Sequence, residues 1–136
     1  MFSNSEEQFK ELLNQLVARS KKSLLANSFP VFGLLLTEEG NTDVVLGVVE
    51  DGDLSEIINN VQQELIEKKN ALSILAACLA YPDFNNQCVV AYLENHESYQ
   101  LRCDIPVLNN DVLELDIENL TTKDGSTIVF GNNDVA

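Results

Sequence analysis

The chain has 136 residues, enough for one domain with a sizeable core, and 45% of them are hydrophobic, which is typical of a globular protein. It carries 22 acidic and 8 basic side chains, a formal net charge of -14, which disfavours binding to nucleic acid or anionic lipid. No apolar run is long enough to span a bilayer. The acidic N-terminus lacks the pattern of a signal peptide, and three cysteines agree with a reducing compartment, so we expect a cytoplasmic protein.

The negative charge is unevenly distributed along the chain. Residues 38–56 carry seven acids and no base, and residues 83–136 carry ten acids and two bases, whereas the two remaining stretches are close to neutral. Such blocks keep a protein soluble, and they also attract basic partners or cations. The charge therefore allows two interpretations, a solvated surface and a docking surface for a basic protein.

The N-terminal stretch predicts a helix over residues 5–26. Ser3 or Ser5 can cap its first turn, and Asn27, Ser28 and Pro30 end it. Its apolar positions recur at the helical period. They are Phe9, Leu12, Leu13, Leu16, Val17 and Leu24.

A hairpin is predicted next, with strands over residues 31–37 and 42–50 and a turn over 38–41. Gly40 can take the positive φ that such a turn requires. Both strands have apolar residues at adjacent positions rather than in alternation. We therefore expect the hairpin to be covered on both faces.

Residues 53–70 predict the second helix, which begins with a capping box of Asp53 and Glu56. Lys68 and Lys69 lie in its last turn, where cations suit the helix dipole, and Asn70 follows its end. Residues 71–80 carry no charge and do not alternate, so they predict a central strand that is buried on both faces.

The C-terminal half predicts a loop over residues 81–86 and a second hairpin with strands over 87–94 and 99–105. Pairing about a turn at 95–98 places Glu94 opposite Tyr99 and Val90 opposite Cys103. Pro106 breaks the pattern, and residues 112–118 alternate again. A turn at 123–125 then leads to a short apolar strand over 126–130, and residues 131–136 are expected to fray.

These elements predict one α+β domain over residues 1–136 with the order α-β-β-α-β-β-β(-β). A single, mainly antiparallel sheet of five to seven strands would pack with two helices. One helix on each face would cover the sheet, whereas two helices on one face would leave the other face to a second copy. Residues 107–130 form an arm that closes the sheet or swaps into a neighbour.

Two resemblances follow from the order of short motifs. Four segments, taken in order, resemble a group of small bacterial α+β proteins that have no assigned activity. They are Phe29-Pro30-Val31-Phe32-Gly33, the capped helix, residues 75–81 and Tyr92-Leu93-Glu94-Asn95-His96. The likeness covers roughly residues 25–106, and Asn95 interrupts the group's Leu-Glu-His. The element order also resembles the roadblock scaffold, which is longin- and profilin-like. This second likeness is one of topology and implies no function by itself.

The cysteines and the histidine do not form a recognisable site. Cys78, Cys88, Cys103 and His96 are suitable zinc ligands, but no Cys-x-x-Cys spacing is present, and each cysteine lies in an apolar strand. His96 lies at the tip of a predicted hairpin, on the order of 20 Å from Cys103, which is too far for a nucleophile pair. We therefore expect no metal site and no cofactor.

Acidic side chains are the better candidates for binding. Three carboxylates alternate along a predicted strand, those of Glu114, Asp116 and Glu118. Their alternative roles are to protect a sheet edge, to contact a partner and, less readily, to bind a cation. The turn at 50–53 gathers further carboxylates, which capping and turn formation explain. The predicted partner-binding set is Glu50, Asp51, Asp104, Glu114, Asp116 and Glu118.

The sequence holds no phosphate-binding loop, dinucleotide motif, nucleophile elbow or zinc-protease helix. We therefore expect no catalytic residues and a non-enzymatic module that docks a basic protein, for example an immunity or inhibitor protein of a basic toxin. The first alternative is a roadblock-like homodimeric structural module. The second is a small hydrolase that uses Glu114, Asp116 or the 51–53 turn, with or without a metal.

Overall fold

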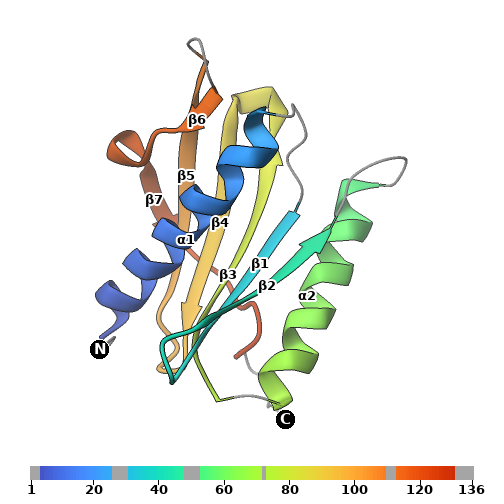
Figure 1. Cartoon of the computed structure of the whole chain (residues 1–136), viewed down its shortest axis with the longest axis vertical. Helices are drawn as coiled ribbons and strands as arrows, with labels where there is room; N and C mark the ends of the chain where they lie inside the picture. The colour runs from blue at the N-terminus through green and yellow to red at the C-terminus, as the bar shows by residue number, and fades with distance from the viewer. Residues whose placement is uncertain (1–3, 26–30, 48–52, 72, 110–112, 131–136) are drawn as a thin grey trace.

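The computed structural model describes residues 4–25, 31–47, 53–71, 73–109 and 113–130, and all statements on structure concern these residues. Figure 1 shows helices packed on a strongly twisted sheet. In chain order the elements are α1 (Ser5–Leu25), β1 (Val31–Thr37), β2 (Thr42–Gly47), α2 (Leu54–Ala71), β3 (Ile74–Asp83), η1 (Phe84–Asn86), β4 (Cys88–Asn95), β5 (Gln100–Asn109), β6 (Leu113–Leu115), η2 (Ile117–Asn119) and β7 (Thr121–Asp124). The predicted α+β class and element order are confirmed.

The seven strands form one sheet in the order β2-β1-β3-β4-β5-β6, with β7 paired to β5 beside β6. Every neighbouring pair is antiparallel. Because β1 lies between β2 and β3, α2 connects two strands that are not neighbours and crosses over β1 (Figure 1). This crossover places α2 against β1 and β2.

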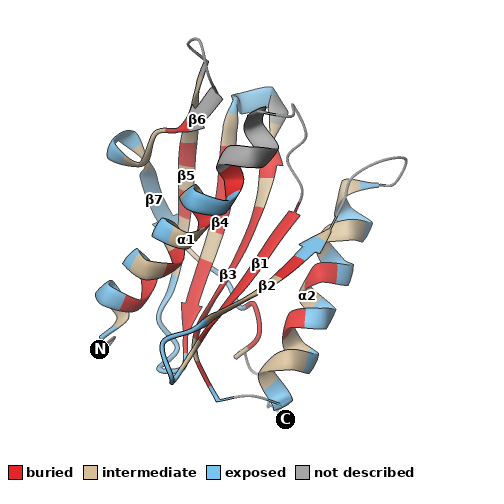
Figure 2. Ribbon diagram, in the orientation of Figure 1, coloured by how far each residue is buried: buried red, intermediate tan, exposed pale blue. Residues whose placement is uncertain are grey.

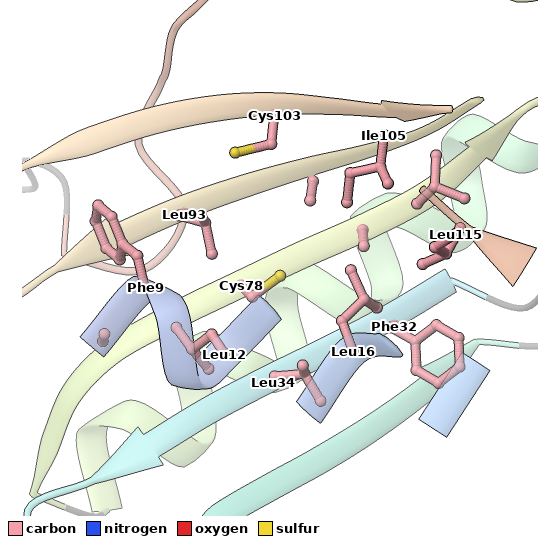
Figure 3. Close-up of a cluster of buried hydrophobic side chains, with 14 of the residues drawn as sticks. Phe9, Leu12, Leu16, Phe32, Leu34, Cys78, Leu93, Cys103, Ile105 and Leu115 are labelled. Carbon is pink, nitrogen blue, oxygen red and sulfur yellow. The ribbon is translucent and has the colours of Figure 1, made fainter. Parts of the chain in front are cut away.

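The two helices cover opposite faces of the sheet. Phe9, Leu12 and Leu16 of α1 pack with Phe32, Leu34 and Leu36 of β1, and Figure 3 shows this cluster. Val61 and Leu65 of α2 pack with Val31 and Leu35, which point to the other face. The first six residues of β1 are consequently all buried, and most of β3 is buried as well (Figure 2). The predicted two-sided cover is confirmed for β1 and for most of β3, and one chain supplies it, whereas β2 is covered only in part and Leu46 is exposed. The argument that a second copy must cover the sheet therefore no longer applies, and the homodimer stays a prediction.

Two glycines let α2 lie close to the sheet. A Cβ atom at Gly33 of β1 would lie 2.9 Å from both Leu65 δ carbons and from Val61 Cγ1. At Gly47 of β2 it would lie 2.6 Å from the Cγ2 atoms of Ile57 and Val61. Such distances are too short for real contacts, so the bare backbone at these two positions sets the helix–sheet distance.

The helix ends differ slightly from the prediction. Asn4 rather than Ser5 caps α1, because the N–H of Glu7 donates to Asn4 Oδ1 at 2.9 Å, and Ser3 lies outside the described residues. Ser5 is already the first helical residue. The Asp53 half of the predicted capping box of α2 is confirmed by the Ser55 N–H, which donates to Asp53 Oδ1 at 3.1 Å, whereas Glu56 makes no such hydrogen bond among the described residues. The helix continues to Ala71, and the central strand begins at Ile74 rather than at residue 71.

The pairing of β4 with β5 is shifted by one residue from the prediction. Glu94 lies opposite Gln100, and Cys103 lies opposite Ala91 rather than Val90. The turn is one residue tighter than expected, because Asn95 closes it by accepting the N–H groups of Glu97 and Tyr99 on its side-chain oxygen. A one-residue shift exchanges the faces of a strand. Leu93, Ala91 and Val89 therefore join the α1-side cluster, and Tyr92 faces the α2 side.

The predicted loop at 81–86 is only partly correct. Tyr81, Pro82 and Asp83 continue β3, and only residues 84–86 leave the sheet, as a short 3-10 helix. Pro82 is tolerated because it lies beyond the last β1–β3 pair, Phe32 with Ala80, and pairs only with β4.

The C-terminal arm departs most from the prediction. β5 continues through Pro106, which lies between the part of β5 that pairs with β7 and the part that pairs with β6. The expected strand over 112–118 stops at Leu115, and residues 117–119 form a 3-10 helix. Residues 126–130 form no strand, whereas residues 121–124, which overlap the predicted turn at 123–125, form β7. Residues 131–136 lie outside the described residues.

Candidate functional site

The structure describes the side chains of three members of the predicted acidic set, Asp104, Asp116 and Glu118. Glu50 and Asp51 lie outside the described residues, and so does the side chain of Glu114, whose backbone belongs to β6. Asp116 precedes η2, and one of its carboxylate oxygens accepts the Asn119 side-chain amide at 2.7 Å. Glu118 is exposed on the same short helix. Because the strand ends at Leu115, the expected regular row of carboxylates on one strand face is not formed.

Asp104, in contrast, lies in a charged cluster on the α2-side face of β5. Its carboxylate pairs with Arg102 Nε at 2.8 Å and with Lys123 Nζ of β7 at 3.2 Å, and 16% of the side chain is exposed. Burial by itself would raise the pKa of Asp104, but the hydrogen bonds from Arg102 and Lys123 outweigh it and lower the pKa below its ordinary value. Asp104 is therefore an ionised and already neutralised group, which makes it a poor contact for a basic partner.

A recess of about 360 Å³ surrounds this cluster. Its lining includes two acids, Asp83 and Asp104, and two bases, Arg102 and Lys123, so the charges balance. The pKa of the Cys88 thiol in the same recess is raised by burial and then by Asp83 and Asp104, which disfavours the reactive thiolate. The recess offers polar groups of both signs and no activated nucleophile.

Two tyrosines lie beside Arg102, and ionisation of one of them, Tyr81, is disfavoured. The rings of Tyr81 and Tyr92 stack with their centroids 6.3 Å apart, and the Arg102 guanidinium lies 5.8 Å from the Tyr92 ring centroid. Burial, followed by the neighbouring Tyr92, raises the pKa of Tyr81 to about 12. The stacking of the two rings and the contact of Tyr92 with the guanidinium indicate that the tyrosines have a structural role, which is to hold Arg102 in place.

The other two cysteines belong to the core. Cys78 and Cys103 point into the α1-side cluster (Figure 3). Burial raises the pKa of both thiols, that of Cys103 to about 11. His96 is exposed in the β4–β5 turn, and no group of three or more His, Cys, Asp or Glu residues in the described ranges could hold a metal ion.

The acidic side chains that do come together lie at one end of the sheet, which we call the turn end. It comprises residues 38–41 of the β1–β2 turn and residues 96–99 of the β4–β5 turn. The N–H of Glu38 donates to the Ser73 carbonyl, and that of His96 donates to the Leu75 carbonyl, so both turns flank the start of β3. Figure 2 shows both turns as exposed. Strands two positions apart in a sheet are separated by about 10 Å, which brings Glu38, Glu39 and Glu97 onto one surface.

The turn end also carries Tyr99, one of the two large apolar side chains that stand exposed in the described part of the chain, at 59%. Its backbone is held by Asn95, whose N–H donates to the Tyr99 carbonyl and whose side-chain oxygen accepts the Tyr99 N–H. No ion pair or hydrogen bond among the described residues engages the carboxylates of Glu38, Glu39 or Glu97. The turn end thus presents unpaired carboxylates on a surface that also carries an exposed aromatic ring.

Sequence reasoning missed Glu94 and Asn95, which are both completely buried at the end of β4. The signal was present, because two adjacent polar residues end a strand that is apolar on both faces. Glu94 faces α2, and Asn95 faces α1, where its amide donates to Gln8 Oε1 at 3.2 Å. Two positions of the sequence resemblance thus have structural roles, Gly33 under α2 and Glu94 in the interior.

No family model, curated protein or solved structure matches the chain. The resemblances to small bacterial α+β proteins and to the roadblock scaffold therefore stay predictions. None of the described helices has the length and the apolar character that crossing a membrane requires.

Proposed function

We propose that the protein is a non-enzymatic docking module that binds a basic protein through the turn end. The observation that carries the proposal is the convergence of Glu38, Glu39 and Glu97 beside Tyr99, in a chain of net charge -14. The carboxylates of Asp43 and Asp104 take part in ion pairs, whereas those of Glu38, Glu39 and Glu97 take part in none among the described residues. The uncompensated charge is therefore available to a partner.

The turn end has the features of an interface that attracts and then holds a cationic surface. Exposed carboxylates accelerate association with a basic partner, and the effect weakens as salt screens it. An exposed aromatic ring adds apolar contact and can stack on a lysine or arginine side chain. Since Asn95 and β3 fix both turns, little entropy is lost when they bind.

The test compares two variants of equal charge. The turn-end variant carries Glu38→Gln, Glu39→Gln and Glu97→Gln. The control variant carries Glu56→Gln, Glu64→Gln and Glu67→Gln on the exposed side of α2. Each change removes three negative charges, so both variants have a formal net charge of -11, from -14 plus 3.

Each immobilised protein is exposed to lysate of its own host at low salt, eluted with a salt gradient and analysed by mass spectrometry. We expect a basic protein that binds the wild type and the control variant but binds the turn-end variant at least about tenfold more weakly. Equally weakened binding by both variants would show that net charge alone causes the effect. It would contradict the turn end as the binding site. Retention that does not change with salt, or retention of no basic protein, would contradict the electrostatic proposal.

A further inference from the structure

The last described residues, 126–130, form a strap that crosses the α2-side face of the sheet. In Figure 1 this trace leaves β7 and passes behind the strands toward α2. Ile128 and Val129 are 2% and 6% exposed and belong to the same apolar cluster as Val61 and Leu65 of α2. The strap is thus packed in a groove between α2 and the sheet.

The wall formed by α2 contacts the strap through polar groups as well. Gln62 Nε2 donates to the Ile128 carbonyl at 2.9 Å. Lys69 Nζ lies 5.8 Å from the centroid of the Phe130 ring. These contacts fix the position and direction of the strap along the helix.

The floor of the groove is the carboxylate of Glu94, which is fully buried. Its Oε1 accepts three successive backbone N–H groups, those of Ile128, Val129 and Phe130, at 2.8, 2.7 and 3.1 Å. Its Oε2 accepts the Thr127 hydroxyl at 3.2 Å. Successive N–H groups that converge on one oxygen form a nest, a common backbone site for anions.

Glu94 has no cationic partner among the described residues, and its remaining contact is a 3.4 Å hydrogen bond from the Gln100 side-chain amide. A buried carboxylate without donors is costly, so the strap N–H groups replace its hydration. Most polar contacts of the groove are thus made to peptide backbone. Binding of a segment there therefore depends little on the identity of its side chains.

The strap is joined to the rest of the fold through a short, exposed strand. It follows β7, whose four residues are all exposed and which pairs with β5 on the rim of the sheet. Gly125 joins the two, and a Cβ atom there would collide with the backbone of Gln100 and Leu101. Elements with little buried area of their own open at a lower free energy than the core.

We propose that the groove between α2 and β4 is a peptide-binding site that the strap occupies as a built-in lid. When the strap detaches, the sheet and α2 stay folded and the Glu94 carboxylate becomes accessible. The ligand is then a bent, apolar peptide segment of a partner protein that presents three successive N–H groups, as residues 128–130 do. This proposal uses a different face from the turn end and does not depend on it.

The first experiment measures amide hydrogen exchange of the wild-type chain by NMR. We expect the amides of Ile128, Val129 and Phe130 to exchange at least about 100-fold faster than the core amides of Leu79 and Leu93, with little dependence on denaturant. Exchange of the strap amides only through global unfolding would overturn the lid.

The second experiment opens the groove in the full chain with Val129→Pro, which removes the donor of the 2.7 Å bond and leaves Glu94 and α2 intact. The probe is a fluorescein-labelled peptide, Gly-Ser-Thr-Ile-Val-Phe-amide, with the sequence of residues 125–130. Fluorescence anisotropy should show at least about tenfold tighter binding to this variant than to the wild type, since the tethered strap competes at a high effective concentration.

Two controls separate backbone recognition from non-specific apolar binding. Val129→Ala keeps the N–H group, so we expect it to open the groove much less than Val129→Pro. A probe N-methylated at the Val position should bind the Val129→Pro variant at least about tenfold more weakly, and adding Glu94→Leu should abolish binding. Absence of probe binding to a folded Val129→Pro variant would overturn the peptide site. If that variant does not fold, the exchange experiment on the wild type decides the question of the lid.

Discussion

Asn95 joins three elements, and its replacement tests the account of the turn end. Its side chain is completely buried, its oxygen accepts the N–H groups of Glu97 and Tyr99 at 3.0 Å each, and its amide donates to Gln8 of α1 at 3.2 Å. A hydrogen bond contributes about 0.5–1.5 kcal/mol net to stability. Asn95→Ala removes three, so we expect the free energy of unfolding to fall by about 2–4 kcal/mol.

The assay is urea denaturation followed by circular dichroism, because the chain contains no tryptophan. A double-mutant cycle with Gln8→Ala isolates the contact between helix and turn, for which we expect a coupling free energy of about 0.5–1.5 kcal/mol. Asn14→Ala, on the exposed side of α1, is the matched control and should cause no loss of stability. A loss below about 1 kcal/mol for Asn95→Ala, or a coupling near zero, would refute the proposed role of Asn95.

Three further predictions test the packing, the charged cluster and the thiols. Gly33→Val should lower the free energy of unfolding by about 1–3 kcal/mol in the same urea assay, because the new side chain would collide with Leu65. Asp104→Asn should cost about 1 kcal/mol at pH 7. The folded-state pKa of Asp104 is lowered, so this stabilisation is fully present above the unfolded pKa and is lost as pH falls through the folded pKa. In melts across pH, wild type and variant should therefore begin to converge near the ordinary aspartate pKa of about 4 and coincide only below the lowered folded pKa. Iodoacetamide at pH 8 should modify the half-buried Cys88 first and the buried Cys103 only on unfolding, as read by peptide mass spectrometry.

Each of these three predictions has a contrary outcome. Unchanged stability of Gly33→Val would mean that α2 does not lie against β1 as described. A difference between wild type and Asp104→Asn that persists at pH 2 would show that the ion pairs are not its cause. Rapid alkylation of Cys103 in the folded protein would contradict its burial.

Much of the fold was predictable because it depends on local patterns. Apolar residues at the helical period placed both helices within a few residues, and the charge-free run after the second helix identified the central strand. Adjacent apolar positions in β1 predicted burial on both faces, which the structure confirms. These features depend on residues close in sequence and on one apolar-to-polar pattern, so they can be read without the tertiary structure.

The candidate site was less predictable, because its groups come together from distant parts of the chain. Asp104 was selected for its charge, but two cations, one of them from β7, neutralise it. The row of carboxylates over 114–118 assumed a strand, and the chain forms a 3-10 helix there instead. The turn end forms because β1 and β4 both pair with β3, and composition does not reveal this pairing.

The sequence by itself determined both helices, the strands β1 to β5 to within a few residues, the two-sided burial of β1 and β3 and the strong negative charge, because local periodicity and composition are sufficient for these properties. Only the tertiary structure decided the register of the β4–β5 hairpin, the path of residues 107–130 and the partner of Glu94. The physical reason is that a buried carboxylate is stable wherever the fold brings donors to it, and here the donors are backbone N–H groups 34 to 36 residues away. Backbone N–H groups are common to nearly all residue types, so no pattern of side chains could predict which of them bind Glu94.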